Sequence, residues 1–246
     1  PMSSSIWSSS QESIKRFPMK SLSSFFKNHG LLDLIKRPQW FTVLGGSDNY
    51  VEKIINVSDI NNIVTDAELL IKRERKKVLL QNKGVTSQYD LLIFACHANQ
   101  IEGILTDISP KEAEILSMFE YTNNNVLLHD DKNLMPKEES LWSSWNSFKS
   151  KNYDYVTYWM NNLQKLDTEK EIFVTLGNCP KIDEERIFKK ICYEHPLYSE
   201  NTLEGQKYLE SIQGENNTYF VGAHLGYGFH EDGIKSTAEM LKNINE

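Results

Sequence analysis

A strand, a glycine-rich loop and a helix follow one another at the C-terminal end of the chain, and this unit constrains the fold most. Residues 218–221 are aromatic or β-branched, as in a strand. The glycines that follow are Gly222, Gly226 and Gly228, and one face of the closing helix carries Ile234, Ala238, Leu241 and Ile244. A helix N-terminus offers unpaired N–H groups, and glycines let a ligand approach the backbone. The unit therefore suits an electron-rich or anionic group. Because it matches neither G-x-G-x-x-G nor the P-loop, an ordinary strand–turn–helix connection explains it equally well.

The rest of the chain predicts a mixture of strands and helices, and hence an α+β fold. Strands are expected at 68–73, 76–80, 89–95, 125–129, 155–160 and 172–176. The charged run 72–77 is interpreted as a solvated hairpin turn, and 89–95 as a strand buried on both faces. Helices are expected over 14–35 with a break at Gly30, after an N-cap at Ser47, and from Ser109-Pro110 through Phe119. Residues 133–150 are expected to form a loop.

Composition excludes two classes of function. The chain has 27 basic and 34 acidic residues and a formal net charge of −7, which argues against a nucleic-acid binder. No run of about 18 apolar residues is present, so no transmembrane segment is predicted. Cys96, Cys179 and Cys192 are odd in number and lack C-x-x-C spacing. They predict neither a disulfide framework nor a zinc site, and reduced thiols point to a cytoplasmic protein.

Polar side chains cluster in the C-terminal unit and raise the alternative of a metal site. The cluster consists of His224, His230, Glu231 and Asp232. A metal-dependent hydrolase would use His224, His230 and Glu231, but the H-E-x-x-H spacing of a helical zinc site is absent. Structural or cofactor-shell roles fit these residues better, and no metal ligand is predicted.

Two further groups of residues have both a chemical and a structural interpretation. Cys96 and His97 are adjacent, but neighbouring side chains on a strand point to opposite faces, so a small core thiol beside a loop histidine is favoured over a catalytic pair. An aromatic set lies further along the chain, at Trp142, Trp145, Tyr155, Tyr158 and Trp159. These aromatics either line an apolar pocket or belong to the core.

Several segments, taken in order, resemble one family of flavoproteins. They are residues 1–8, 25–32, 37–47, 121–130 with Met135-Pro136, 142–146, 156–164 and 222–236. Together they resemble the FAD-dependent amine-oxidase-like oxidoreductases, relatives of the phytoene-desaturase and monoamine-oxidase class. Each motif is weak alone, but their ordered combination is specific and covers nearly the whole chain.

The resemblance implies roles for particular residues around an FAD cofactor. The backbone at Gly222-Ala223 would lie by the ribityl–pyrophosphate stretch, and the helix start would face the pyrimidine edge of the flavin. That start consists of His230, Glu231, Asp232, Gly233 and Ile234. The strand that includes Glu68 would contact the adenine through its backbone. The Gly45-Gly46 turn would lie between the cofactor and the substrate, and Trp145, Tyr158 and Trp159 would belong to the substrate region.

The sequence departs from the family pattern at three places. Ala223-His224 stands where the family usually has Gly-Glu, and Asp48 stands where Arg commonly follows Gly-Gly-Ser. The G-x-G-x-x-G unit with its ribose-binding acid is missing and is expected upstream of Pro1. The chain is therefore interpreted as part of a longer protein, without the N-terminal dinucleotide-binding segment that such an enzyme needs to hold FAD.

The expected architecture is a largely antiparallel substrate-domain sheet with helices, combined with the C-terminal part of an FAD-binding α/β domain of Rossmann-like type. Expected boundaries are 1–60 for a helical substrate region, 61–108 for part of the FAD domain, 109–214 for the substrate sheet and 215–246 for the closing unit. The resemblance implies hydride transfer from a small organic substrate, an amine or a lipid-like or isoprenoid chain, to flavin. The alternative is a non-enzymatic interaction domain.

Overall fold

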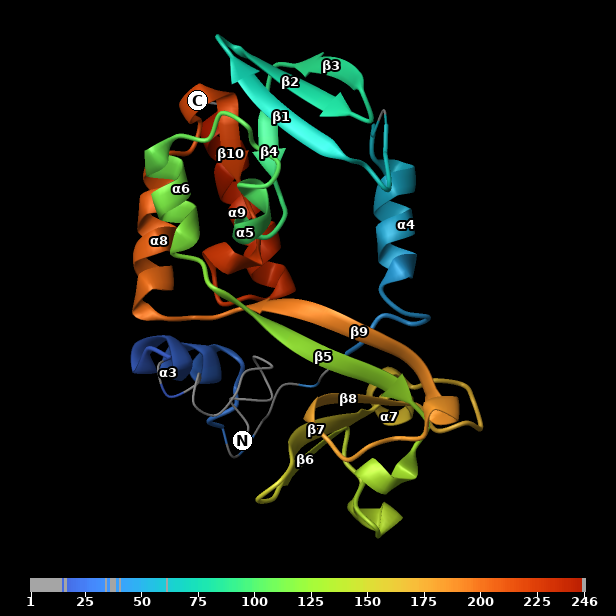
Figure 1. The fold of residues 1–246 in the computed structure, drawn as a ribbon. Coiled ribbons are helices and arrows are strands. Elements are labelled where there is room, and N and C mark those ends of the chain that lie inside the picture. The colour runs from blue at the N-terminus through green and yellow to red at the C-terminus, as the bar shows by residue number, and fades with distance from the viewer. Residues whose placement is uncertain are drawn as a thin grey trace. The chain divides into compact units, whose positions relative to one another are not determined.

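The computed structural model describes residues 15, 17–33, 35, 39, 41–60 and 62–244. Predictions for residues 1–8, and for most of 37–40, lie outside these ranges. The described chain forms two compact units. The first contains Ile35–Ile63 and Thr122–His195, and the second contains 64–121, 196–244 and the described part of 12–34 (Figure 1). The mixed α and β content, with antiparallel sheets and a strand–loop–helix at the C-terminal end, confirms the predicted fold class.

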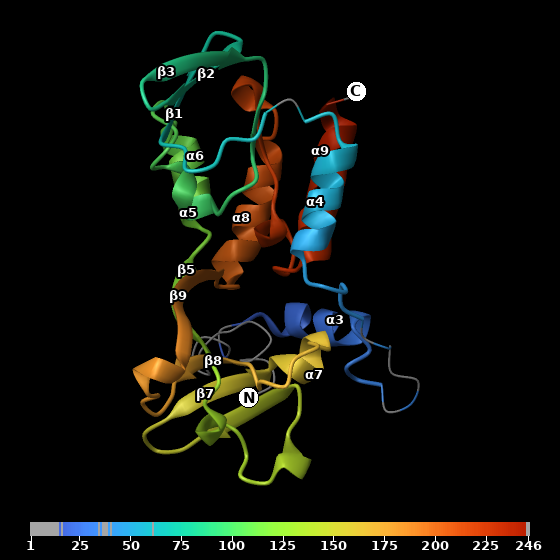
Figure 2. The ribbon, with the colours of Figure 1, turned by 90° about the vertical axis from the view of Figure 1, so that its right-hand side faces the viewer.

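The second unit is built on a parallel pair of strands. Strand β4 (Leu92–Phe94) pairs with β10 (Thr218–Phe220), so that Leu92 lies opposite Thr218 and Phe94 opposite Phe220. Three helices, α5 (Ala98–Ile101), α6 (Pro110–Ser117) and α8 (Glu200–Ser211), contribute to the core over one face of this pair. Phe94 and Phe220 stack there with ring centroids 5.7 Å apart. Figure 2 shows α6 and α8 side by side, with α9 (His230–Ile244) beyond them.

Strand β4 is not buried on both faces, contrary to the prediction for 89–95. Leu92 and Phe94 are buried, but Ile93 between them is 42% exposed. The core of this unit covers only the face to which Leu92 and Phe94 point. The other face of β4 is open among the described residues.

A three-stranded antiparallel sheet accompanies the parallel pair. Its strands are β1 (Leu69–Glu74), β2 (Lys77–Asn82) and β3 (Val85–Tyr89), in that order. The predicted hairpin between the first two is confirmed, but the run 72–77 is not wholly solvated. Arg73 lies on the same face of β1 as buried Ile71, and its side chain is only 4% exposed. Alternation along a strand carries this arginine inward, where carboxylates receive it.

The start of helix α6 agrees with its sequence signals. Helix α6 begins after Ser109, whose side chain accepts from the Glu112 N–H while Glu112 returns a bond to the Ser109 N–H. This reciprocal capping box, with Pro110 at the first position, confirms the predicted start. Helix α3 (Met19–Asn28) is shorter than the expected 14–35 and ends before Gly30, which has φ +61°.

The first unit contains a five-stranded sheet of order β6-β7-β8-β5-β9. The strands are β5 (Tyr121–His129), β6 (Trp145–Lys149), β7 (Asp154–Trp159), β8 (Phe173–Asn178) and β9 (Ile187–Pro196). Helices α4 (Asp48–Val57) and α7 (Met160–Gln164) belong to the same unit. Strand β6 lies in a segment predicted as loop, and β9 and α8 were not predicted at all. Short 3-10 helices occur at Lys132–Leu134, Glu139–Leu141, Glu184–Arg186, Glu215–Asn217 and Ala223–Leu225.

One face of this sheet carries a buried chain of polar side chains. His129 Nε2 lies 2.8 Å from Thr175 Oγ1, which lies 2.8 Å from Thr157 Oγ1. The Asp131 N–H donates to His129 Nδ1 at 3.1 Å, so that Nδ1 is an acceptor and Nε2 carries the proton. Burial lowers the pKa of His129 to about 4, although Asp131 and Asp130 oppose the shift. A neutral imidazole therefore joins three strands.

The two units observed in the structure group the residues differently from the expected segments 1–60, 61–108, 109–214 and 215–246. Residues 109–121 and 196–214 belong to the unit that contains β10. The reason is the core, since Ile115 and Phe119, in and just after α6, and Leu209 in α8 pack in one cluster with Phe94 and Phe220. Among the described residues, no helix is both long and apolar enough to cross a lipid bilayer.

Candidate cofactor site

Two glycines let the backbone turn sharply after β10. Gly222 has φ +149°, and a Cβ there would lie 2.8 Å from the His224 ring. Gly228 has φ +93°, and a Cβ there would lie 2.7 Å from the Tyr198 hydroxyl. The side chains of His224 and Tyr198 are both buried. The segment 222–229, which we call the glycine loop, therefore needs glycine at both positions.

Hydrogen bonds inside the glycine loop turn two of its carbonyl groups inward. Gly222 O accepts from Leu225 N at 3.1 Å, and Ala223 O accepts from Gly226 N and Gly228 N at 3.1 and 3.0 Å. The N–H of a trans peptide points away from its carbonyl. The N–H groups of Ala223 and His224, which belong to these same peptides, therefore point out of the loop.

Unpaired donors gather where the loop meets α9. Among the described residues we find no acceptor for the backbone N–H groups of Ala223, His224, His230 and Glu231. The N–H groups of Ala223 and His224 point out of the loop. Those of His230 and Glu231 lie in the first turn of the 15-residue helix α9, whose N-terminus carries a partial positive charge. Gly233 keeps the approach open, because a Cβ there would meet only Ala223 N, at 3.7 Å. The arrangement suits an anionic or electron-rich ligand.

Asp232 organises the loop from inside. Its Oδ2 accepts from the N–H groups of both Tyr227 and Phe229 at 3.0 Å. A Cβ at Gly226 would overlap the Asp232 carboxylate, so the loop passes directly against it. Of the predicted cofactor residues, Asp232 therefore acts through the backbone that it holds. His230, Glu231 and Ile234 have exposed side chains on the first turns of α9.

Replacing Asp232 with alanine should loosen the glycine loop locally. Two N–H donors would lose their acceptor, at a cost of about 1–3 kcal/mol. Hydrogen exchange at the Tyr227 and Phe229 amides would report the change, and exchange in β4 should stay as it was. Glu231→Ala, one position earlier with an exposed side chain, is the control. Unchanged protection of both amides in Asp232→Ala would contradict the assignment.

The His224 side chain is buried beside the loop without a partner for one nitrogen. It is 6% exposed, and its Nε2 has no hydrogen-bond partner. Its ring meets Phe119 edge-on at 5.1 Å. Burial, and secondarily the nearby His97, lowers the pKa of His224 to about 4. The imidazole is thus neutral near pH 7, and an unsatisfied polar atom lies next to the unpaired amides.

Side chains that sequence reasoning missed hold the loop from outside. Tyr198 Oη donates to Ala223 O at 3.3 Å, and Gln206 Nε2 donates to His224 O and Gly226 O at 3.0 and 2.9 Å. Ser236 Oγ accepts from Gly222 N at 3.0 Å. The Ser199-x-x-Thr202 capping box was the available signal for α8, which carries Gln206.

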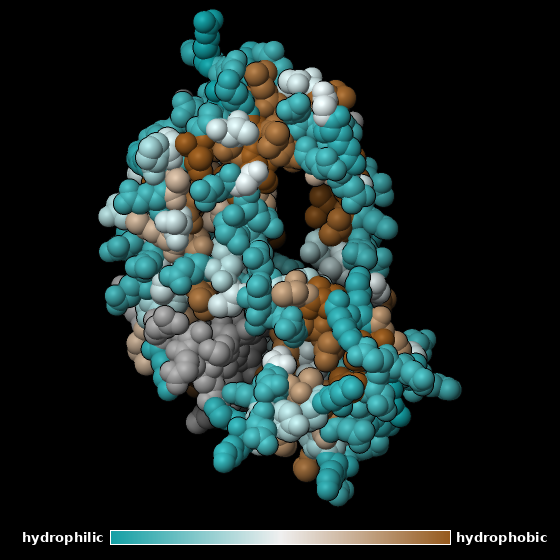
Figure 3. Space-filling view, viewed as in Figure 1, coloured by the Kyte–Doolittle hydropathy of each residue, from teal (hydrophilic) through white to brown (hydrophobic). Residues whose placement is uncertain are grey.

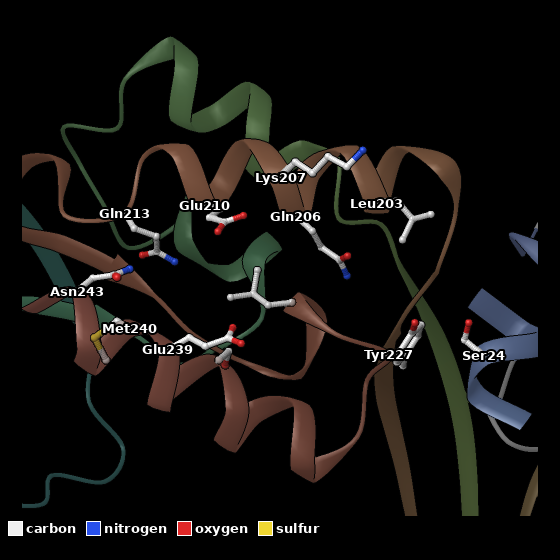
Figure 4. Close-up of a pocket in the computed structure, with 12 residues that line it drawn as sticks. Ser24, Leu203, Gln206, Lys207, Glu210, Gln213, Tyr227, Glu239, Met240 and Asn243 are labelled. Atoms are coloured by element: carbon white, nitrogen blue, oxygen red, sulfur yellow. The ribbon is translucent and has the colours of Figure 1, made fainter. Parts of the chain in front are cut away.

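A cavity of about 520 Å³ lies between α8 and α9 beside the loop. Figure 4 shows Gln206 pointing from α8 toward the loop, while Glu239 and Met240 approach from α9. An adjoining smaller cavity is lined by Gln206, Tyr227 and Asp232. The loop is therefore open on this side as well.

The predicted adenine contact at Glu68 is only partly available. Strand β1 begins at Leu69, one residue later. The Glu68 N–H already donates to the Asn82 side chain at 3.0 Å. An adenine at this place would therefore meet the Glu68 carbonyl or side chain, which is exposed.

The predicted substrate residues fall on two faces of the sheet. Trp145 and Tyr158 are register partners on one face, with ring centroids 5.7 Å apart. Trp159 is next in sequence to Tyr158 and points to the opposite face, where it donates to Glu171 at 2.6 Å and meets Trp142 at 5.3 Å. Gly45 and Gly46, with φ +79° and +95°, form the turn before α4 in the same unit.

A second cavity of about 520 Å³ lies in the sheet unit between β5, β9 and the segment that joins β8 to β9. Its apolar lining includes Val126, Leu127, Ile187 and Ile191. Figure 3 shows hydrophobic side chains gathered where β5 and β9 run side by side. This surface lies apart from the Trp145–Tyr158 pair along the sheet order.

The alternatives raised for the polar clusters find little support in the geometry. Among the described residues, no three His, Cys, Asp or Glu side chains are placed to share a metal ion. Cys96 packs against the core, and burial raises the pKa of its thiol. His97 stacks on Tyr121 at 4.7 Å. These contacts agree with the interpretation of Cys96 and His97 as a core thiol beside a histidine.

Known proteins match this chain through structure. No family model and no curated protein sequence matches it. A protein of Exiguobacterium sp. 255-15 assigned as a protoporphyrinogen oxidase matches with TM-score 0.58 and 13% identity, over 92% of this chain and 57% of that one. A putrescine oxidase solved with putrescine bound matches with TM-score 0.56 and 10% identity, over 82% and 54% of the two chains.

A double mutant of putrescine oxidase matches with TM-score 0.54 and 9% identity, over 81% of this chain and 53% of that one. The chain spans little more than half the length of these structures. The resemblance to the amine-oxidase-like oxidoreductases is thereby confirmed at the level of fold.

Proposed function

We propose that this chain provides the substrate-domain sheet and the C-terminal part of the flavin domain of an FAD-dependent oxidoreductase. The observation that carries the proposal is the group of unpaired N–H donors at Ala223, His224, His230 and Glu231, with Gly233 leaving the Ala223 nitrogen uncovered. When bound there, FAD would supply acceptance of a hydride from a substrate C–H bond. The oxidase fold of the matched structures supports the same reading.

The residues present fit a flavin rather than a small inorganic anion alone. Donors that leave the loop at Ala223 and His224 suit the ribityl–pyrophosphate stretch, and those at His230 and Glu231 suit the carbonyl-bearing pyrimidine edge. The Asp232 carboxylate accepts two backbone N–H bonds within the loop, and these donors offset part of its negative charge. The neutral His224 imidazole adds no charge near pH 7.

The open edge of β4 supports a further strand in this domain. Among the described strands, β10 alone pairs with β4, and Ile93 is 42% exposed on the uncovered face. Parallel sheets are normally covered on both faces, and a two-stranded sheet is marginal by itself. We infer that an upstream strand and helix, carrying the dinucleotide-binding glycines, complete the flavin site.

The substrate would be a small organic molecule that meets the Trp145–Tyr158 face of the sheet. On this face Val156, Leu176 and Tyr158 are partly buried, and Trp145 is 43% exposed. An aromatic, apolar wall suits an amine with a hydrocarbon body or a lipid-like chain.

The test is the visible absorption of the protein after addition of FAD. The spectrum should be taken for this chain and for the chain extended by the upstream sequence of its gene. A flavin spectrum that stays with the extended protein through gel filtration supports the proposal. If both proteins stay colourless, the flavin proposal is wrong.

Gly233→Leu should separate cofactor binding from folding. A helix gains up to about 1 kcal/mol from the loss of glycine, and a Cβ at this position has room. The longer side chain would cover the Ala223 N–H, so the Kd for FAD should rise about tenfold or more, or about 1.4 kcal/mol. Ala238→Leu, at an exposed position of the same helix, is the matched control. If the two variants bind FAD with equal affinity, the flavin does not bind at this loop.

An interaction domain without flavin is the second candidate, because of α4. None of its residues is buried, and Tyr50, Val51, Ile54 and Ile55 form an exposed apolar face. Amphipathic helices of this kind dock into hydrophobic grooves. If FAD does not bind, this helix becomes the surface to test.

A further inference from the structure

The inference that follows rests on the proposed flavin site and concerns how that site keeps its shape. The unpaired N–H groups of the glycine loop are useful only if the loop carbonyls point elsewhere. A carbonyl turned toward the ligand would replace a donor with the negative end of a dipole. Some contact must therefore hold the carbonyl groups on the other side.

Gln206 makes such a contact twice. Its Nε2 donates to His224 O at 3.0 Å and to Gly226 O at 2.9 Å, so one amide group uses both hydrogens on the loop. The two carbonyls belong to the peptides 224–225 and 226–227, which flank the Leu225–Gly226 pair, and the Leu225 N–H itself bonds to Gly222 O. The middle of the loop is thus fixed from α8 and from its own backbone.

The contact is local to one position of α8. Lys207, the next residue, is exposed, and Figure 4 shows it directed away from the Gln206 amide. Gln213, two turns later, bonds to the N–H and carbonyl of Phe220 on β10 at 2.8 and 2.7 Å. Gln213 therefore closes the edge of the strand, whereas Gln206 acts on the loop itself.

We infer that Gln206 is a positioning residue for the flavin, which holds the carbonyls of His224 and Gly226 toward α8 so that the amides of Ala223 and His224 stay available to the cofactor. Tyr198, which lies just before the N-cap of α8, supports the same arrangement through its bond to Ala223 O. Gln206 does not touch the reacting atoms and acts through the backbone.

Gln206→Glu tests the inference, because it replaces a donor by an acceptor of the same shape. An ionised carboxylate would repel both carbonyls, whereas a protonated one could donate to one of them. Acidic Glu210, Asp232 and Glu239 line the cavities around this position, with Lys207 and Lys235 opposing them. Below neutral pH the variant should therefore recover part of the contact.

The first readout is the affinity for FAD, measured in whichever form binds it, this chain or the chain extended upstream. In Gln206→Glu the Kd should rise about tenfold at pH 8 and fall again toward pH 5.5, whereas the wild-type Kd should not follow this course. Lys207→Gln, which makes the same change in net charge one residue away, should behave as wild type. A pH-independent, wild-type Kd in Gln206→Glu would overturn the inference while leaving the flavin site in place.

The second readout needs no flavin and separates the two proposals. Hydrogen exchange at the amides of Leu225, Gly226 and Gly228 reports the loop directly, because these N–H groups bond inside it. After correction for intrinsic rates, Gln206→Glu should lose protection there at pH 8 and regain it at pH 5.5. Unchanged protection overturns the positioning role, whatever the outcome with FAD.

Discussion

Replacing Arg73 with methionine is expected to lower the free energy of unfolding of the β10 unit by about 3–5 kcal/mol. The guanidinium donates to Asp107 Oδ2 at 3.0 Å and to Glu112 Oε2 at 2.9 Å, and also reaches Thr218 on β10 at 3.4 Å. The Arg73 and Glu112 side chains are 4% and 3% exposed. Removing one partner would leave the other as an uncompensated buried charge.

The pKa of Glu112 shows how strongly the pair is coupled. Burial alone would raise this pKa, but the hydrogen bonds from Arg73 and Ser109 outweigh burial and hold it at about 2. In Arg73→Met the carboxyl would keep only the Ser109 bonds. Its pKa should therefore rise, and the stability loss of the variant relative to the wild type at the same pH should shrink as the pH is lowered toward 5.

Urea unfolding followed by the helix signal in circular dichroism would measure these changes. The double variant Arg73→Met/Glu112→Gln removes both charges and should be more stable than Arg73→Met alone. Lys111→Met is the matched control, since its pair with Glu215 at 3.0 Å is exposed and is worth less than about 1 kcal/mol. Equal losses in Arg73→Met and Lys111→Met would show that the buried pair is not important for stability.

Arg73 also shows where sequence reasoning stops. The hairpin was predictable from local pattern, and so was the start of α6, because the Ser109 box and Pro110 lie within one turn. The inward direction of Arg73 depends on Glu112, which is far along the chain, and no local pattern indicates that partner. A charged run predicts a solvated turn unless tertiary contacts override it.

The elements that the sequence did not predict have polar inward side chains or are largely exposed. Helix α8 has Gln206 on its inner side, and the turn that follows the helix has Gln213, and both of these amides bond to backbone rather than pack in the core. Strand β9 is largely exposed along its length and lies at the sheet edge, so it lacks a clear alternation. Both would be recognised only with knowledge of what they contact.

The candidate site also contains parts that the sequence could predict and parts that it could not. The glycine loop and the start of α9 were predictable, because strand, glycine and helix signals are local. The residues that hold the loop, Tyr198, Gln206 and Ser236, come from outside it and needed the structure. Trp159 is a different case, since alternation along β7 already separates it from Tyr158.

Acidification from pH 7 to pH 5 is expected to destabilise both units through one buried histidine in each. His129 lies in the sheet unit and His224 in the β10 unit, and burial lowers both pKa values from an ordinary 6.5 to about 4. Between pH 6.5 and pH 4 each of these imidazoles is protonated in the unfolded chain and neutral in the folded chain. Stability is therefore complete above about pH 6.5 and falls with pH, by about 2 kcal/mol for each histidine at pH 5.

Variants can assign the loss to each histidine separately. His129→Gln keeps a donor for Thr175 and an acceptor for the Asp131 N–H but cannot be protonated, so the sheet unit should lose less stability on acidification. Among the described residues the tryptophans, Trp142, Trp145 and Trp159, all lie in the sheet unit, so their fluorescence during urea unfolding reports it. His224→Gln should flatten the pH dependence of the helix signal instead.

The exposed His230 provides the control, because His230→Gln should leave both pH dependences unchanged. If His129→Gln and His224→Gln retain the wild-type fall between pH 7 and pH 5, the buried imidazoles are not its origin. If each variant flattens only the signal of its own unit, the protonation of His224 becomes a way to open the glycine loop while the sheet stays folded. Loss of bound flavin at acid pH would then follow from an uncompensated charge beside the unpaired amides, where a positive imidazolium has no described carboxylate to meet its Nε2.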